Sequence, residues 1–235
     1  MGIYSILQCI IVVGFFSWSS HAQAPVVENS TIRVLVVLVQ WSNHGNRTLP
    51  TRDDIDQLWN GPGNTTLVPG ESVADWMKSN SYGKFEVQAD VAEWYQVRES
   101  EMEASFGNMG NSSFGASGLE IILRPALKKT GFNLTDYVDA NGDLIGVIFV
   151  HSGYAAEQGG VDEDGIEYLN RIASISWAID VKIQTGVRLK TFATVSALKG
   201  LNGTKMAGIG HHIHNWFHAR FGLHDLNDRG GRCEC

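Results

Sequence analysis

Hydrophobic and polar positions follow two different periods along this chain, and together they predict both strands and helices. A nearly continuous run of β-branched and aliphatic residues at 31–41 (TIRVLVVLVQW) is typical of a strand buried on both faces. A second hydrophobic run at 145–153 (IGVIFVHSG) predicts another strand, and residues 84–97 (KFEVQADVAEWYQV) alternate as a half-exposed strand or hairpin does. A further short strand is predicted at 189–195, whereas residues 172–183 give a mixed signal.

Helical segments are predicted between these strands. Thr51 and Ser72 each begin a sequence typical of a helix capping box, with an acidic residue three positions later. Apolar residues at helical spacing predict a longer helix at 119–129, closed by Gly131, and a final helix at 207–221. Strands separated by helices indicate a mixed α/β domain of the α+β kind, and 235 residues suffice for one such domain.

The final predicted helix carries two different stripes at 100° per residue. The stripe that we expect to face the core comprises Ile209, Ile213, Trp216, Phe217 and Phe221, and the other comprises His211, His214 and His218. The i, i+4 spacing of His214 and His218 brings two imidazoles over one point, as a zinc site on a helix requires. His224 follows ten residues after His214, beyond a glycine, which is the three-ligand spacing of metzincin peptidases. The alternative at this stage is a polar helix face with solvated histidines.

Charge and the N-terminal composition narrow the functional classes. A net charge of −7 without a Lys/Arg-rich run argues against nucleic acid or an anionic membrane surface as a partner. An apolar run followed by small residues predicts a secretory signal peptide at 1–22 and a mature domain at 23–235. The run is shorter than the ~20 residues that a membrane anchor needs, so no membrane contact is expected after cleavage.

Glycosylation sequons and cysteines independently indicate a secreted, extracellular protein. The N-x-S/T sequons lie at Asn29, Asn46, Asn64, Asn111, Asn133 and Asn202. The mature chain retains Cys233 and Cys235, a C-x-C pair poorly placed to bridge to itself. We therefore expect each cysteine to pair with a partner that this sequence does not contain, as it would in a longer protein.

Several longer stretches carry a resemblance to a known family. They include VLVVLVQWSNH, SVADWMKSNSYGKFEVQADVAEWY and DANGDLIGVIFVHSGYAAEQGG, followed by RIASISW and GLHDLND. On these stretches the chain resembles secreted zinc metallopeptidases of the immune inhibitor A family over nearly all of its mature length. The resemblance implies a metzincin-like zincin domain, in which the active-site helix lies beneath a twisted mixed sheet. It also implies hydrolysis of a protein or peptide substrate by zinc-activated water.

The resemblance assigns roles to particular residues. His214 and His218 become the first two zinc ligands, and Asn215 occupies the position of the general-base Glu. A neutral amide cannot accept the proton, and loss of a general base costs on the order of 10²–10⁴-fold in rate. Counting from the histidines makes His224 the third ligand, whereas counting from the G-L-x-D-L motif makes it Asp225.

Three functional hypotheses follow for residues 23–235. The first is a secreted zinc endopeptidase, and the second is a catalytically inactive homologue that binds metal or substrate on a peptidase scaffold. The third is a truncated sequence whose longer protein is intact, because no methionine follows Met206 to form the methionine turn of metzincins. Under this third hypothesis the domain is incomplete at its C-terminus. The sequence makes no prediction of oligomeric state.

Acidic loop residues offer two further candidates. Asp139, Asn141 and Asp143 alternate as at the start of a calcium loop, although the glycine and closing glutamate of such a loop are missing. They form either a plain turn or a structural cation site. Glu157 and Asp162 are either substrate-cleft residues or ordinary loop acids.

Overall fold

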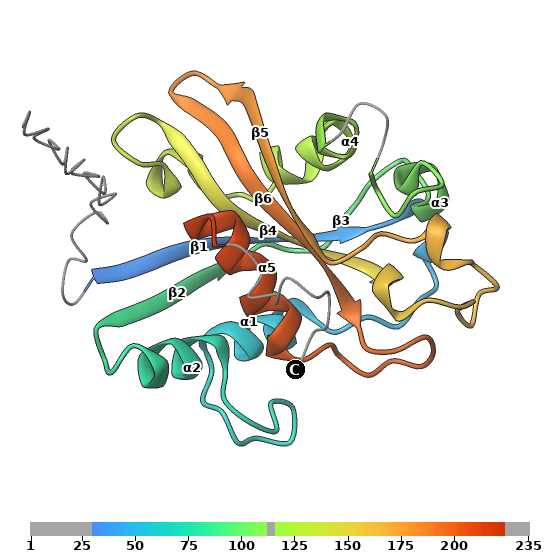
Figure 1. The fold of residues 1–235 in the computed structure, drawn as a ribbon, viewed down its shortest axis with the longest axis horizontal. Helices are drawn as coiled ribbons and strands as arrows, with labels where there is room; N and C mark the ends of the chain where they lie inside the picture. The colour runs from blue at the N-terminus through green and yellow to red at the C-terminus, as the bar shows by residue number, and fades with distance from the viewer. Residues whose placement is uncertain (1–29, 112–115, 224–235) are drawn as a thin grey trace, which may run out of the picture.

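A six-stranded mixed sheet forms the centre of the molecule (Figure 1). The structure is a computed structural model that describes residues 30–111 and 116–223. The strands are β1 (Ser30–Gln40), β2 (Phe85–Val91), β3 (Tyr95–Gln96), β4 (Asp143–Tyr154), β5 (Ile175–Gln184) and β6 (Val187–Leu198). Their order is β2-β1-β4-β6-β5, with β3 beside β1. Each described pairing is parallel except that of β5 with β6, so β5 is an antiparallel edge strand.

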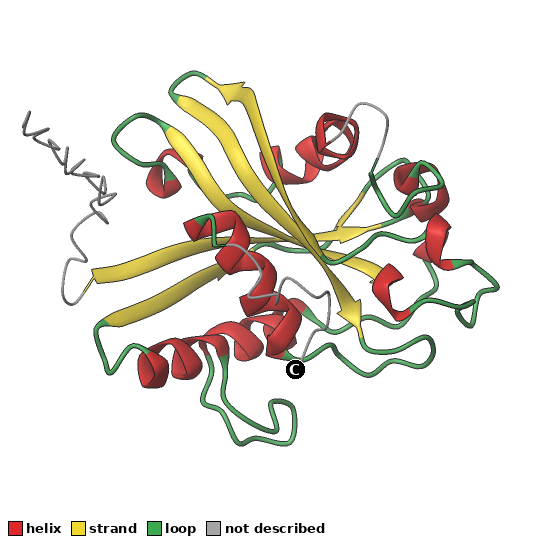
Figure 2. Cartoon of the chain, in the orientation of Figure 1, coloured by secondary structure: helices red, strands yellow, loops and turns green. Residues whose placement is uncertain are grey.

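Helices cover both faces of this sheet (Figure 2). They are α1 (Arg52–Asn60), α2 (Val73–Asn80), α3 (Glu101–Ser105), α4 (Ala116–Lys128) and α5 (Ile209–Phe221). One core cluster joins the sheet to α1, α2 and α5, and a second joins its other face to α3 and α4. The predicted mixed α/β class is therefore confirmed. No helix in the described ranges is long and apolar enough to cross a bilayer.

Strand β1 is buried on both faces, as its uninterrupted hydrophobic run predicts. Val34, Val36 and Leu38 enter the core beneath α1, α2 and α5. The alternating residues Leu35, Val37 and Val39 enter the opposite core, where α4 packs. The period of two thus places successive β1 side chains in different cores and makes this strand common to both layers.

The sequence pattern was less informative for the later strands and one helix. The mixed signal at 172–183 corresponds to β5, a full strand of 10 residues, and the short strand predicted at 189–195 is part of β6, which has 12 residues. Exposed and buried positions mix along β5 because it is an edge strand. Helix α3 was not predicted, because five residues are too few to display a helical period.

The two predicted capping boxes have different outcomes. Thr51 and Asp54 form a complete box at the start of α1, with both reciprocal hydrogen bonds present. Ser72 caps α2 by accepting the N–H of Asp75, at 3.1 Å. The Asp75 carboxylate instead accepts the N–H of Gly63 at 2.7 Å, so it ties the preceding loop to α2. Only half of the second box is therefore formed.

The predicted glycosylation sites are accessible wherever the structure describes them. Exposed sequon asparagines are Asn46, Asn64, Asn111, Asn133 and Asn202. Asn29, the predicted signal peptide and the two C-terminal cysteines lie outside the described residues. Exposure is compatible with glycan attachment, which remains a prediction.

A bulge in β4 fixes the C-terminal part of α5 against the sheet. Gly146 has a φ of 78°, and the β4–β6 register shifts on both sides of Ile145. The Gly146 N–H donates to Thr191 Oγ1 at 2.9 Å, and the Thr191 hydroxyl donates to the carbonyl of Ala219 at 2.5 Å. A Cβ at position 146 would lie 3.2 Å from the Cα of Arg220. Only glycine therefore allows the helix to approach this closely.

Gly146→Ala should lower the free energy of unfolding by about 1–3 kcal/mol, because it combines a positive φ with overlap against helix backbone. Urea unfolding of the two proteins measures this loss. Gly165→Ala is the matched control, since Gly165 has a φ of 79° with no other atom close to the added Cβ. Equal losses in the two variants would show that close approach of α5 contributes nothing.

Candidate functional site

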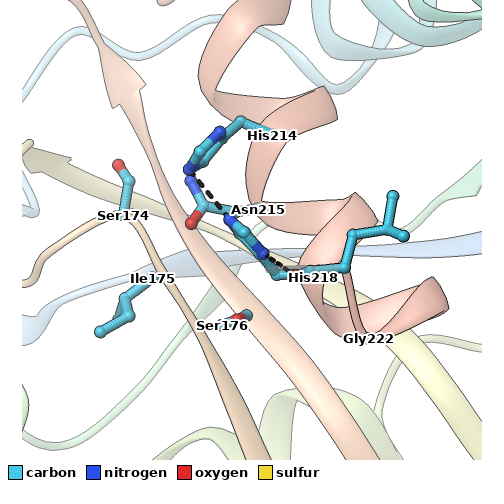
Figure 3. Close-up of a pocket in the computed structure, with 8 residues that line it drawn as sticks. Ser174, Ile175, Ser176, His214, Asn215, His218 and Gly222 are labelled. Carbon is cyan, nitrogen blue, oxygen red and sulfur yellow. Dashed lines mark hydrogen bonds between the residues drawn. The ribbon is translucent and has the colours of Figure 1, made fainter. Parts of the chain in front are cut away.

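Two histidine side chains meet on the outer surface of α5 (Figure 3). The Nε2 atoms of His214 and His218 lie 3.1 Å apart. Their rings are edge-to-face, with centroids 4.5 Å apart and planes at 86°. The spacing of one helical turn therefore brings the two predicted ligands together, as the sequence indicated.

The end of the helix controls the orientation of His218. Gly222 adopts a left-handed conformation, with a φ of 63°, and its N–H donates to the carbonyl of His218. The turn brings the Leu223 carbonyl to His218 Nδ1, which donates a hydrogen bond to it. In neutral His218 this bond places the proton on Nδ1 and leaves the Nε2 lone pair facing His214.

An open cavity of about 480 Å³, called the groove below, lies between this part of α5 and the beginning of β5. Its lining residues are Ser174, Ile175, Ser176, His214, Asn215, His218, Gly222 and Leu223. Because β5 is the edge strand, one side of the groove is a strand without a further described neighbour in the sheet. The groove thus combines the histidine pair with an edge that can accept an extended chain.

The distance between the two imidazole nitrogens is close to that between two zinc ligands. Tetrahedral zinc with ordinary Zn–N distances holds two nitrogens about 3.3 Å apart. The observed 3.1 Å matches that separation and also suits a hydrogen bond between the rings. Among the described residues, no group of three or more His, Cys, Asp or Glu side chains is arranged to hold a metal ion. The predicted third ligands, His224 and Asp225, lie outside the described residues.

Asn215 lines the groove, and its amide nitrogen is bound to the helix backbone. The residue is only 4 % exposed, and its Nδ2 donates to the carbonyl of His211 at 3.0 Å. An amide has no basic lone pair at neutral pH, so Asn215 can bind or orient a ligand but cannot take a proton from water.

The acidic turn predicted at 139–143 is formed by side-chain-to-backbone hydrogen bonds. Asp139 Oδ1 accepts the N–H groups of Asp143 at 3.0 Å and Asn141 at 2.8 Å. These bonds, led by that from Asp143, hold the pKa of the Asp139 carboxyl below its usual value. The turn is thus explained without a cation, and calcium binding remains a prediction.

Glu157 and Asp162 have different roles. Glu157 Oε2 accepts the N–H of Ser174 at 3.0 Å, and its Oε1 lies 3.8 Å from His211 Nδ1, so it borders the groove. Asp162 is buried, and its Oδ1 accepts two backbone N–H groups of its own loop. Asp162 is therefore a structural loop acid.

The core-facing side of α5 differs from the predicted stripe. Phe221, expected in the core, is 42 % exposed because it lies at the end of the helix and contacts only neighbouring rings of α5 in the described aromatic pairs. His212 is fully buried instead, edge-on to Trp59 at 5.8 Å. Neither ring nitrogen of His212 has a hydrogen-bond partner among the described residues. Burial lowers the pKa of this imidazole to about 3.

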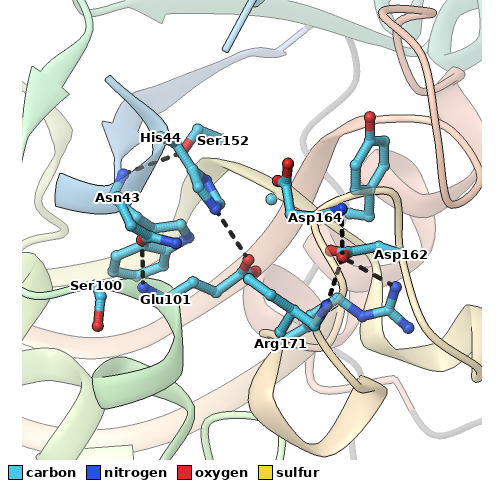
Figure 4. A network of polar contacts seen from close by, with 12 residues as sticks. Asn43, His44, Ser100, Glu101, Ser152, Asp162, Asp164 and Arg171 are labelled. Atoms are coloured by element: carbon cyan, nitrogen blue, oxygen red, sulfur yellow. Dashed lines mark hydrogen bonds and ion pairs between the residues drawn. The ribbon is translucent and has the colours of Figure 1, made fainter. Parts of the chain in front are cut away.

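A buried polar cluster near the groove was also missed by the sequence reasoning (Figure 4). Glu101 Oε2 lies 3.5 Å from His44 Nε2, and Glu101 Oε1 lies 3.7 Å from His151 Nδ1. Burial raises the pKa of Glu101 to about 8 and lowers the pKa values of His44 and His151 to about 3. The one available sequence signal was a histidine inside the hydrophobic run of β4.

In this cluster Ser152, His44 and Glu101 contact one another in the sequence of a Ser–His–acid catalytic triad, but the serine cannot act as a nucleophile. Ser152 Oγ lies 2.9 Å from His44 Nδ1, and His44 faces Glu101. Ser152 is completely buried and accepts the N–H of Trp41, so a substrate carbonyl cannot reach its hydroxyl. The cluster is therefore not a nucleophilic site.

Comparison with known proteins adds no family to this description. No protein-family model matches the chain, and no curated protein matches it. The resemblance to immune inhibitor A-like peptidases therefore remains a prediction from the sequence stretches.

His212→Leu should flatten the fall in stability on the acid side. The folded-state pKa of His212 is about 3 against 6.5 for an ordinary histidine, so only the unfolded chain binds this proton between those values. The contribution of His212 to the free energy of unfolding is complete above pH 6.5. It is lost at about 1.4 kcal/mol per pH unit as the pH falls toward 3. Urea unfolding from pH 7.5 to 5 should show a smaller slope in the variant.

The neighbouring exposed histidine provides the control. His211→Leu makes the same chemical change one residue earlier on the same helix. It should leave the steep acid-side slope in place. A slope unchanged by His212→Leu would show that His212 is not buried in its neutral form.

Proposed function

We propose that this chain is a secreted zinc metallopeptidase of metzincin-like architecture. His214 and His218 hold the zinc, together with His224 or Asp225. The observation that carries the proposal is the 3.1 Å separation of the two Nε2 atoms, with His218 oriented by the Leu223 carbonyl. Zinc bound there supplies a polarised substrate carbonyl and a bound water of lowered pKa.

The groove supports a peptide as the substrate. Strand β5 ends the described sheet on the side of the groove, and Ile175 at its beginning is 40 % exposed. An extended peptide can add to such an edge through backbone hydrogen bonds, while its side chains enter neighbouring depressions. This placement would bring a backbone carbonyl of the peptide alongside His214 and His218.

The residue type at position 215 determines how fast we expect peptide hydrolysis to be. A peptidase with this arrangement needs a carboxylate beside the first histidine to accept the proton of the attacking water. The amide leaves that transfer to solvent, which raises the barrier by about 3–5 kcal/mol. We therefore propose slow turnover for the unaltered chain.

A zinc-dependent peptide-binding protein without turnover is the second candidate. It is favoured by the Asn215 amide, which lines the groove and donates to the His211 carbonyl but has no basic lone pair to accept a proton. The two candidates share the metal and the groove and differ only in hydrolysis.

Zinc binding tests the metal site directly. The mature protein should retain one zinc per chain after dialysis, and His214→Ala or His218→Ala should lose it, because each removes a ligand. His211→Ala is the matched control, since this exposed histidine lies one turn earlier on the same helix. Elemental analysis and titration calorimetry provide the measurement. Absence of zinc from the unaltered protein would overturn the site.

Restoring the carboxylate tests the reaction. Asn215→Glu should raise chelator-sensitive cleavage of casein or a quenched peptide by about 10²–10⁴-fold over the unaltered chain. Asn215→Gln has the same length without a base and should leave the rate low. Zinc retention with activity only in Asn215→Glu would select the binding protein, and rapid cleavage unaffected by Asn215→Glu would contradict the role given to this position.

A further inference from the structure

Side chains from three separate elements bind the backbone of residues 172–174, which lead into the wall of the groove formed by Ser174, Ile175 and Ser176. Glu101 Oε1 accepts the N–H of Ile172 at 3.2 Å. The Thr194 hydroxyl donates to the carbonyl of Ala173 at 2.8 Å, and Glu157 takes the N–H of Ser174. Backbone bonds hold the same segment, because the Ala156 N–H donates to the Ile172 carbonyl and the Ala173 N–H donates to the Met109 carbonyl, both at 3.1 Å. Glu101 is thus one of the side-chain anchors that hold the chain where the lining of the groove begins, at Ser174.

The side chain of Glu101 is tightly enclosed by its neighbours. It is fully buried at the start of α3, and its backbone N–H donates to Asn43 Oδ1 at 3.0 Å. A Cβ on Gly153 would overlap the Glu101 carboxyl group, so only glycine in β4 allows this approach. The carboxyl group is thus enclosed between β4, the segment around His44 and the wall.

Titratable and charged groups face Glu101 from each element packed around it. They are His44 and Arg47 after β1, His151 in β4, and Asp162 and Arg171 in the loop before β5. Arg47 donates to the Ser152 carbonyl at 2.7 Å, and the buried Arg171 donates to the Gly159 carbonyl at 2.5 Å. Arg47 forms an ion pair with Asp164 and Arg171 lies 4.0 Å from Asp162, but both arginines also favour negative charge on Glu101 and so lower its pKa.

We propose that Glu101, His44 and His151 form a latch that closes residues 172–176 onto the fold and so shapes the groove, with Glu101 as the positioning residue. The role of the groove rests on the proposed function. The closure itself is a property of the fold and can be measured without zinc or substrate.

The protonation of the latch gives it a preferred pH. In the closed state Glu101 is neutral up to about pH 8, and His44 and His151 are neutral down to about pH 3. We define the open state as one in which water reaches all three side chains, so that the pKa of Glu101 returns to the ordinary 4.5 and those of the two histidines return to 6.5. From pH 6.5 to 8 the closed state holds one more proton, so opening rises about tenfold per unit with rising pH. From 6.5 down to 4.5 the open state holds one more, so opening rises about tenfold per unit as the pH falls.

Hydrogen exchange of peptides covering residues 172–176 tests the latch in the full mature protein. After correction for intrinsic exchange, the opening equilibrium should be smallest near pH 6.5 and rise on both sides. Glu101→Gln keeps the shape and removes the proton, so the alkaline rise should vanish while the acid rise steepens to about 100-fold per unit. A purely structural role for Glu101 would shift the whole curve without changing either slope.

Two further variants complete the test. Glu120→Gln is the matched control, because Glu120 is also a buried glutamate but pairs with Arg124 on α4. It should keep both the acid and the alkaline rise of the opening equilibrium. His44→Gln should flatten the acid rise, because the one proton that His151 takes up on opening then equals the one proton that Glu101 releases. This second variant keeps the test decisive if Glu101→Gln does not fold.

The outcomes separate the latch from the proposed function. A pH-independent opening of residues 172–176, or an alkaline rise that persists in Glu101→Gln, would overturn the latch even in a protein that binds zinc. A V-shaped profile in a protein that binds no zinc would support the latch and leave the proposed function without its metal.

Discussion

Burial of the central parallel strands on both faces dictates how the other elements of this fold are arranged. β1, β4 and β6 have no solvent-facing side over their central residues, so helices must cover both layers. α5 covers one face and is held by the glycine bulge in β4. α3 and α4 cover the other face. The groove and the latch lie where these layers meet the antiparallel edge strand β5.

Helix α5 serves two environments because its two sides have different chemistry. The inward side places His212 against Trp59 in an apolar core, where burial lowers the pKa of the imidazole to about 3. The outward side brings His214 and His218 together at a separation suited to zinc. The role of each histidine therefore depends on the side of the helix on which it lies, and not on the residue type alone.

The proposed site and the latch are connected through a short length of backbone. Glu101 holds Ile172, and the wall of the groove begins two residues later at Ser174. A buried neutral carboxyl group is costly to ionise. The hydrogen bond from Ile172 to Glu101, which holds the start of the wall in place, therefore also makes its position depend on pH. Groove shape and the protonation of the interior are then parts of one equilibrium.

Elements with a local signal follow from the sequence alone. The strand β1 follows from its β-branched run, and the pairing of His214 and His218 follows from the helical period of 3.6 residues. The complete capping box of α1 follows from the residue types of Thr51 and Asp54 at its start. The length of β5, the burial of His212 and the contact of Glu101 with His44 and His151 follow only from the folded arrangement of the chain. These depend on contacts between residues far apart in the chain, whose pairing no local period records, and on burial, which gives the same side chain a different protonation state.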